Sequence, residues 1–152
     1  MDRMQLLNTL LEREQQRRDA ALAEWQACQR QADEAREQGQ ALSTYRSEYR
    51  QRWSAQFQKS ATMDILRCYQ GFTERLDQAI VAQQGNTLQA EQRVLAARES
   101  LRQRETRVAM VRKLMERRLR IHATQADRRE QKAADETAQR MGWAARQAVA
   151  AA

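Results

Sequence analysis

Two stripes of large apolar residues on either side of a short polar break constrain the fold of this chain most. Before the break, residues at helical spacing share one face: Leu42, Tyr45, Tyr49, Trp53 and Phe57. After it, the same spacing selects Tyr69, Phe72, Leu76 and Ala79. The break, Gln58 to Thr62, has no apolar period and carries hydroxyl residues that suit a turn or a helix N-cap. The pattern predicts the tip of a helical hairpin.

Both stripes continue away from the tip with a mean step near 3.5 residues, the period of a left-handed coiled coil. Toward the N-terminus the row reads Gly39, Ala35, Ala32, Cys28, Trp25, Leu22, Leu11 and Leu7, with a polar turn at Arg18. Toward the C-terminus it reads Gln83, Thr87, Ala90, Val94, Ala97, Leu101, Val108, Val111, Met115 and Leu119. We therefore predict an all-α fold in which two long helices form an antiparallel coiled-coil hairpin.

The expected domain organisation is a single hairpin over residues 1–152. We place helix one at about 2–58, the turn at about 59–63, helix two at about 64–140 and a frayed tail at 141–152, with Gly142 as the helix stop. Folding about the tip pairs Trp53 with Tyr69, Tyr49 with Phe72 or its neighbour, and Leu42 with Ala79 or Ile80. Helix two then overhangs at its C-terminal end, from about Arg120, where it has no packing partner.

Composition supports long helices, because the chain has no proline and only four glycines. Two alternatives remain open at this stage. A charged, polar chain can be disordered, although disordered chains do not keep a seven-residue apolar repeat. The dipeptide Gly85-Asn86 is a turn signal that would convert the hairpin into a three-helix bundle, but the apolar stripe crosses it without a change of phase.

The sequence offers no constellation for catalysis, so we expect a protein that is not an enzyme, with no catalytic residues, no cofactor and no bound metal. No phosphate-binding glycine loop is present, His122 is the single histidine, and Cys28 and Cys68 lack metal-ligand spacing. We interpret both thiols as structural. The longest uncharged run, Gln78 to Ala90, is too short to span a membrane, and the first residues lack a signal-peptide core. We expect a cytoplasmic protein.

Positive charge is concentrated in the terminal part of helix two. Residues 98–132 contain twelve Lys and Arg against five Asp and Glu, a net charge of +7 that equals the net charge of the whole chain. The stripe leaves most cations of this stretch free to face a partner: Arg112, Lys113, Arg117, Arg118 and Arg120. The partner could be an acidic protein surface or a nucleic acid. No aromatic residue interleaves with these arginines, so we do not expect nucleic acid.

Three segments carry a recognisable pattern: the run Gln38, Leu42, Tyr45 and Tyr49; Tyr69-Gln70-Gly71-Phe72 with Leu76 and Ala79-Ile80; and Asp127 to Arg140. These segments resemble the flagellar export protein FliJ family and, more distantly, the YscO-type stalk proteins of virulence type III secretion. The family fold is a two-helix antiparallel coiled coil similar to the stalk of rotary ATPases. The resemblance implies a central stalk or adaptor of the export ATPase ring.

The same resemblance implies further partners: the cytoplasmic part of the membrane export gate, and export chaperones. It places the gate contact on Phe72, Leu76, Ala79 and Gln83, although family members often carry histidine where this chain has Gln83. The basic residues from Arg112 to Arg120 become candidates for the ATPase contact. We expect a monomer that has no membrane span and lies at the inner membrane of the flagellar base through the gate. The competing interpretations are a nucleic-acid-associated coiled coil and a purely structural coiled-coil dimer.

Overall fold

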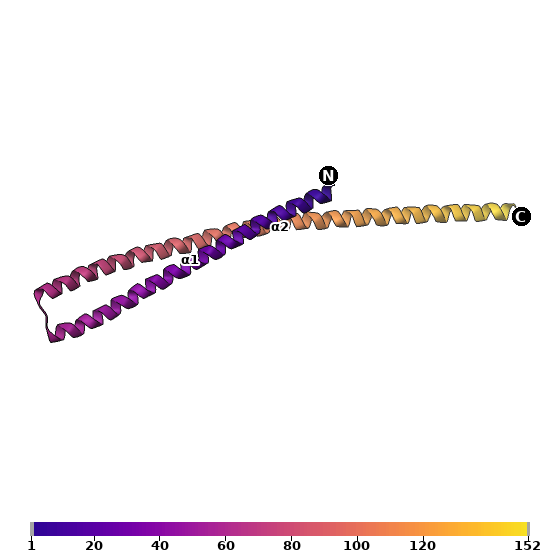
Figure 1. The fold of residues 1–152 in the computed structure, drawn as a ribbon. Helices are drawn as coiled ribbons and strands as arrows, with labels where there is room; N and C mark the ends of the chain where they lie inside the picture. The colour runs from indigo at the N-terminus through magenta and orange to yellow at the C-terminus, as the bar shows by residue number, and fades with distance from the viewer. Residues whose placement is uncertain (1, 152) are drawn as a thin grey trace. The chain divides into compact units, whose positions relative to one another are not determined.

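A computed structural model describes residues 2–151, and these residues form two α-helices joined by a three-residue turn. Helix α1 spans Arg3–Lys59 and helix α2 spans Met63–Ala150. The helices are antiparallel on either side of the turn (Figure 1), and the described residues contain no strand. The predicted all-α hairpin is confirmed. Helix α2 is continuous through Gly85 and Asn86, so the three-helix alternative is wrong.

Both helices begin at residues whose polar atoms satisfy free backbone N–H groups. At the start of α1, the backbone N–H of Asp2 donates to Oε1 of Gln5 at 3.3 Å, and the N–H of Leu6 donates to the Asp2 carbonyl at 3.1 Å. At the start of α2, the N–H of Ile65 donates to Oγ1 of Thr62 at 3.4 Å. Thr62 therefore caps α2, as the hydroxyl residues of the break predict.

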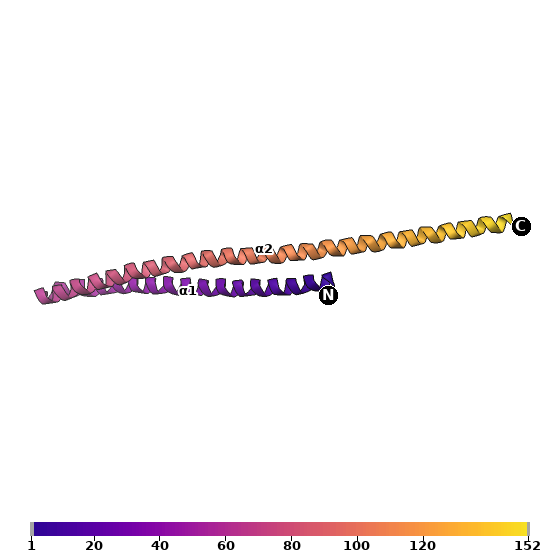
Figure 2. The same ribbon diagram turned by 90° about the horizontal axis from the view of Figure 1, so that it is seen from above.

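Contacts divide the chain into two compact units, which are described separately. The tip unit is residues 14–106, and the terminal unit combines residues 1–13 with 107–152. In the tip unit, α1 and α2 extend from the turn toward the same side in both views (Figures 1 and 2), and the row of buried residues between them forms the seam. Its buried apolar residues are mostly small: Cys28, Ala32, Leu76, Ala90, Ala97 and Leu101.

Polar contacts across the seam hold the register of the tip unit. Nε of Arg36 lies 3.0 Å from Oε1 of Glu91, and Arg46 pairs with Asp77. The side-chain amide of Gln83 donates to the Ala35 carbonyl oxygen at 2.9 Å, which requires a close approach of the two helices.

The seam departs from the predicted stripe at Ala79. This residue is exposed, whereas Ile80 is half-buried, so the inward row passes from Leu76 through Ile80 to Gln83. Steps of three and four both fit a mean of 3.5, and burial of the larger apolar side chain decides between them. Ala79 therefore faces solvent, and its contribution to packing between the helices is small.

Charged residues occupy seam positions that are not part of the predicted apolar stripe. Glu14 is only 7% exposed, and its Oε1 lies 3.4 Å from Nη1 of Arg17. Glu14 Oε2 and Arg104 Nη1 are enclosed, and neither has a hydrogen-bond partner within residues 2–151. Arg18 is half-buried, as the polar turn in the repeat predicts. Buried polar groups at seam positions lower stability but disfavour other registers.

In the terminal unit, Val108 and Val111 are buried and Met115 is half-buried. The predicted next seam residue, Leu119, is 56% exposed, and the half-buried position is Arg118. The row steps by three here, from Met115 to Arg118, whereas it steps by four from Leu76 to Ile80. Burial of the larger apolar side chain therefore does not explain this second departure. Every residue from 119 to 151 is exposed, which confirms the predicted overhang of α2.

The overhang remains helical beyond the predicted end near residue 140. Helix α2 ends at Ala150, and Gly142 does not stop it. A glycine ends a helix by adopting a left-handed conformation, and no described glycine has a positive φ angle. The alanines that follow Gly142 have the highest helix propensity of all residues, so the predicted frayed tail is instead a helix end.

Two glycines inside the helices offer a test of the continuous-helix geometry. A Cβ added at Gly39 would lie 3.6 Å from Cγ of Gln83, an ordinary contact, and one added at Gly85 would meet nothing within 4 Å. We expect Gly39→Ala and Gly85→Ala each to stabilise the fold by about 1 kcal/mol. Thermal unfolding followed by circular dichroism should show a rise of about 2–4 °C for each variant. A lowered midpoint would show that the helices do not accommodate the added methyl group at that position.

Candidate functional site

An aromatic cluster near the turn forms the first candidate surface, and it lies within the tip unit. The Tyr49 ring is central: its centroid lies 4.4 Å from that of Phe72, 5.8 Å from Tyr69, 5.9 Å from Trp53 and 6.2 Å from Tyr45. The predicted pairs Tyr49 with Phe72 and Trp53 with Tyr69 are confirmed, the latter at 5.9 Å. Such ring pairs add stability beyond the area that they bury.

The predicted gate-contact residues come together along this unit but differ in exposure. Phe72 is half-buried, Leu76 is buried at 8% exposure and Ala79 is exposed. From α1, Tyr45 is 45% exposed, and Leu42 and Tyr49 are half-buried. The set therefore mixes residues that hold the helices together with residues that a partner can reach.

Gln83 and Gln38 connect the same surface across the helices. Besides its bond to Ala35, the Gln83 amide donates to Oε1 of Gln38 at 3.5 Å, and Gln38 is exposed. The backbone at Gly39 lies against the Gln83 side chain. Gln83 thus fixes the interhelical geometry beside the exposed residues.

The basic segment of the terminal unit forms the second candidate surface. Arg112, Lys113, Arg117 and Arg120 are exposed, and Arg118 is half-buried. One of these five, Arg120, has a carboxylate nearby, with Nη2 3.6 Å from Oε2 of Glu116. Within the described part of the chain, the other four form no ion pair. Uncompensated exposed cations attract anionic partners.

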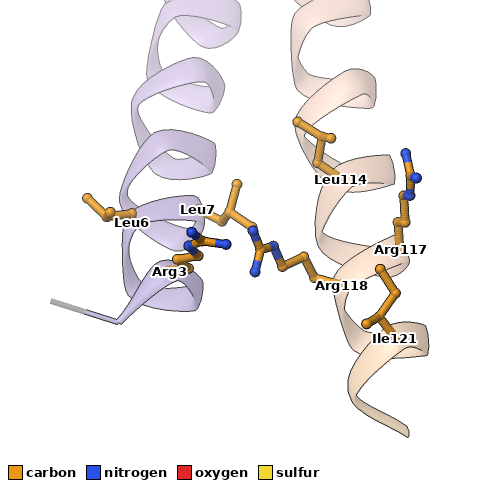
Figure 3. A pocket seen from close by; sticks show the side chains of 7 residues that line it. All are labelled: Arg3, Leu6, Leu7, Leu114, Arg117, Arg118 and Ile121. Carbon is orange, nitrogen blue, oxygen red and sulfur yellow. The ribbon is translucent and has the colours of Figure 1, made fainter. Parts of the chain in front are cut away.

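A groove between α1 and α2 lies beside this segment and contains three of the unit's arginines. Its volume is about 570 Å³, and it is lined by Arg3, Leu6, Leu7, Leu114, Arg117, Arg118 and Ile121. Figure 3 shows Arg3 and Arg118 reaching into the space between the helices, with Leu7 beside them and Leu114 on the facing helix. The main apolar stripe does not predict this groove. Leu114 and Ile121 are one heptad apart, and this spacing indicates a second apolar face on α2.

The two thiols have different environments, contrary to their joint interpretation as structural. Cys68 is exposed, whereas Cys28 is buried and its thiol donates to Oε1 of Glu24 at 3.7 Å. Burial raises the pKa of the Cys28 thiol, and the negative charge of Glu24 raises it further. The reactive thiolate of Cys28 therefore forms only at a higher pH than that of an ordinary cysteine.

This difference predicts selective alkylation. At pH 8, iodoacetamide should modify Cys68 at least tenfold faster than Cys28, as measured by peptide mass spectrometry over time. In denaturant the two rates should converge, which serves as the control. Equal rates in the folded protein would contradict the burial of Cys28.

Within residues 2–151, no cluster of three or more His, Cys, Asp and Glu side chains is arranged to hold a metal ion. Neither helix in this range has an apolar stretch long enough to traverse a bilayer.

Comparison with known proteins identifies the family. The family model described as the flagellar FliJ protein matches residues 4–147, nearly the whole chain. No curated protein and no solved structure matches the chain. The family match covers nearly all of both helices, the aromatic cluster, the groove residues other than Arg3 and most of the overhang. The chain therefore belongs to the flagellar FliJ family and is a component of the flagellar protein export apparatus.

Proposed function

We propose that this protein is a non-enzymatic central stalk and adaptor of the export ATPase ring, which it contacts through its terminal unit. The observation that carries the proposal is the family match over residues 4–147. The exposed cations between Arg112 and Arg120 support it, because they give the terminal unit a surface that attracts an acidic partner at a high rate. A charged surface also tolerates rearrangement inside a ring better than a tight apolar fit.

We further propose that the tip unit contacts the cytoplasmic part of the membrane export gate, and that export chaperones bind the same protein. The mixture of exposed and buried residues around Tyr45, Phe72 and Ala79 supports a contact there. The protein would then act as a monomer in the cytoplasm, held at the inner membrane of the flagellar base by the gate.

A binding and activity assay tests the ATPase proposal. The purified protein is titrated into the cognate export ATPase, complex formation is followed by analytical ultracentrifugation, and ATP hydrolysis is measured in parallel. We expect a complex, together with an increased rate of hydrolysis. Absence of both effects would contradict the stalk function. Sedimentation of the protein alone tests the monomer, and a stable two-chain species would favour a structural coiled-coil dimer.

A further inference from the structure

The groove of the terminal unit is the end of a longer apolar face that neither helix covers. On α1, Leu6 and Leu10 are four residues apart and are 53% and 40% exposed. On α2, Met110, Leu114 and Ile121 follow helical spacing and are 61%, 50% and 47% exposed. Residues four apart lie on one side of a helix, so Leu10 extends the side of Leu6 and Met110 extends that of Leu114. Leu6 and Leu114 line the same groove.

Cations accompany these apolar side chains and lack acidic partners. Arg3, Arg117 and Arg118 line the groove and form no ion pair within residues 2–151. The guanidinium groups of Arg3 and Arg118 enter the space between the helices from opposite sides (Figure 3). Placing like charges in one space without an acid is unfavourable, and a carboxylate between them would remove this cost.

We propose that this groove receives an amphipathic helix of a partner protein whose apolar stripe is flanked by acidic residues. The apolar stripe covers the exposed leucines and Ile121, and the flanking carboxylates pair with Arg3, Arg117 and Arg118. A third helix laid against two others is a common way to cover such a face. This inference rests on the proposed function for the identity of the partner, a component of the export apparatus. The apolar and acidic character of the partner helix is inferred from the groove alone.

Other occupants fit the groove less well. A second copy of the chain would bring its own positive charge, because residues 1–13 and 107–121 contain eight Lys and Arg against three Asp and Glu. Nucleic acid would satisfy the arginines but would leave Leu6, Leu114 and Ile121 facing a phosphate backbone. An acidic amphipathic helix satisfies both kinds of side chain.

The test uses the full chain and a designed 21-residue peptide with leucines at helical spacing and glutamates on both flanks. A scrambled peptide of equal composition removes the apolar stripe, and a 20-base-pair DNA duplex provides the nucleic-acid arm. Affinities are measured by fluorescence anisotropy at two salt concentrations. We expect the designed peptide to bind at least tenfold more tightly than the scrambled one. Equal binding of the two peptides, or tighter binding of the duplex, would overturn the inference.

A pair of substitutions locates the site. Leu114→Gln with Ile121→Gln should weaken peptide binding at least tenfold, since both side chains line the groove. The matched control is Leu88→Gln with Leu95→Gln, an equally spaced pair on α2 in the other unit that is 57% and 65% exposed. Unchanged binding by the groove variant would overturn the inference. A photoreactive group on the apolar side of the peptide should independently label residues 6–7 or 114–121, and labelling elsewhere would also overturn it.

Parallel titration with the cognate ATPase separates the two proposals. If the ATPase binds but the peptide does not, the groove inference fails and the stalk function stands. If the peptide binds in the groove but the ATPase does not, the groove inference is supported, and its partner lies elsewhere in the export apparatus.

Discussion

Replacing both Phe72 and Leu76 by alanine should destabilise the tip unit strongly and abolish binding to the export gate. Leu76 is buried, and a buried Leu→Ala change costs about 2–5 kcal/mol. Phe72 is half-buried and loses part of the ~3–5 kcal/mol of a buried phenylalanine, including its contact with Tyr49 at a centroid distance of 4.4 Å. Circular dichroism should show a thermal midpoint lowered by about 10 °C or more.

Loss of gate binding in that variant could result from a lost contact with the gate or from loss of packing between the helices. A substitution at an exposed residue of the same surface distinguishes these two causes. Ala79 is exposed and contributes little to packing between the helices, so Ala79→Glu should leave the midpoint within about 2 °C. If the gate contacts this surface, the new charge should weaken gate binding at least tenfold. Isothermal titration with the cytoplasmic part of the gate measures the effect.

Two results would show that Phe72, Leu76 and Ala79 serve only the packing of the helices and do not contact the gate. One is full retention of gate binding by the Phe72→Ala, Leu76→Ala double variant at a temperature where it is still helical. The other is wild-type affinity in Ala79→Glu. A matched control is Ala96→Glu, which introduces the same charge at an exposed alanine of α2 several turns away from Ala79 and Gln83. It should bind the gate better than Ala79→Glu if the contact is confined to the proposed surface.

The repeat in the sequence was sufficient to predict the fold, because a mean step of 3.5 leaves few choices for two helices joined by a short turn. It could not predict which residue of an adjacent pair faces inward. At Ala79 and Ile80, and again at Arg118 and Leu119, steps of three and four are both allowed. Local packing selected Ile80 in one case and Arg118 in the other. Hydrophobicity alone would have chosen Leu119.

Polar residues inside the seam were also not predictable from the apolar repeat. Glu14 is buried and Arg104 is half-buried, yet both look like ordinary charged residues of a solvated helix. The sequence contains one indication of their burial. Both residues stand at positions where the seven-residue repeat would place an apolar residue. The groove of the terminal unit was missed for a related reason. Leu6, Leu114 and Ile121 lie outside the main stripe, and a reading that follows one stripe assigns the remaining apolar residues to the surface.

Reversing the charges of Arg117 and Arg118 should nearly abolish association with the export ATPase while leaving the fold intact. Arg117 is exposed, and neither residue forms an ion pair within residues 2–151, so Arg117→Glu with Arg118→Glu breaks no observed salt bridge. Arg118 is half-buried, and loss of packing by its aliphatic stem should lower the midpoint only slightly. Glutamate is also a good helix former.

The effect on association has an electrostatic cause, and salt dependence tests it. If Arg117 and Arg118 attract an acidic surface of the ATPase, wild-type binding should weaken as salt rises, mainly through a slower association rate. The double reversal should reduce affinity at least tenfold at low salt and remove most of the salt dependence. Surface plasmon resonance over a series of salt concentrations measures both rates.

The control for this reversal is Arg50→Glu with Arg52→Glu, which changes the net charge equally at two exposed arginines of the tip unit. It should retain most of the wild-type affinity, because the Debye length at physiological salt is about 8 Å and confines the attraction to nearby groups. Equal losses in the two variants would show that only net charge matters. Wild-type affinity in Arg117→Glu with Arg118→Glu, or binding insensitive to salt, would remove the basic segment from the ATPase contact and leave its charge as a solubility feature.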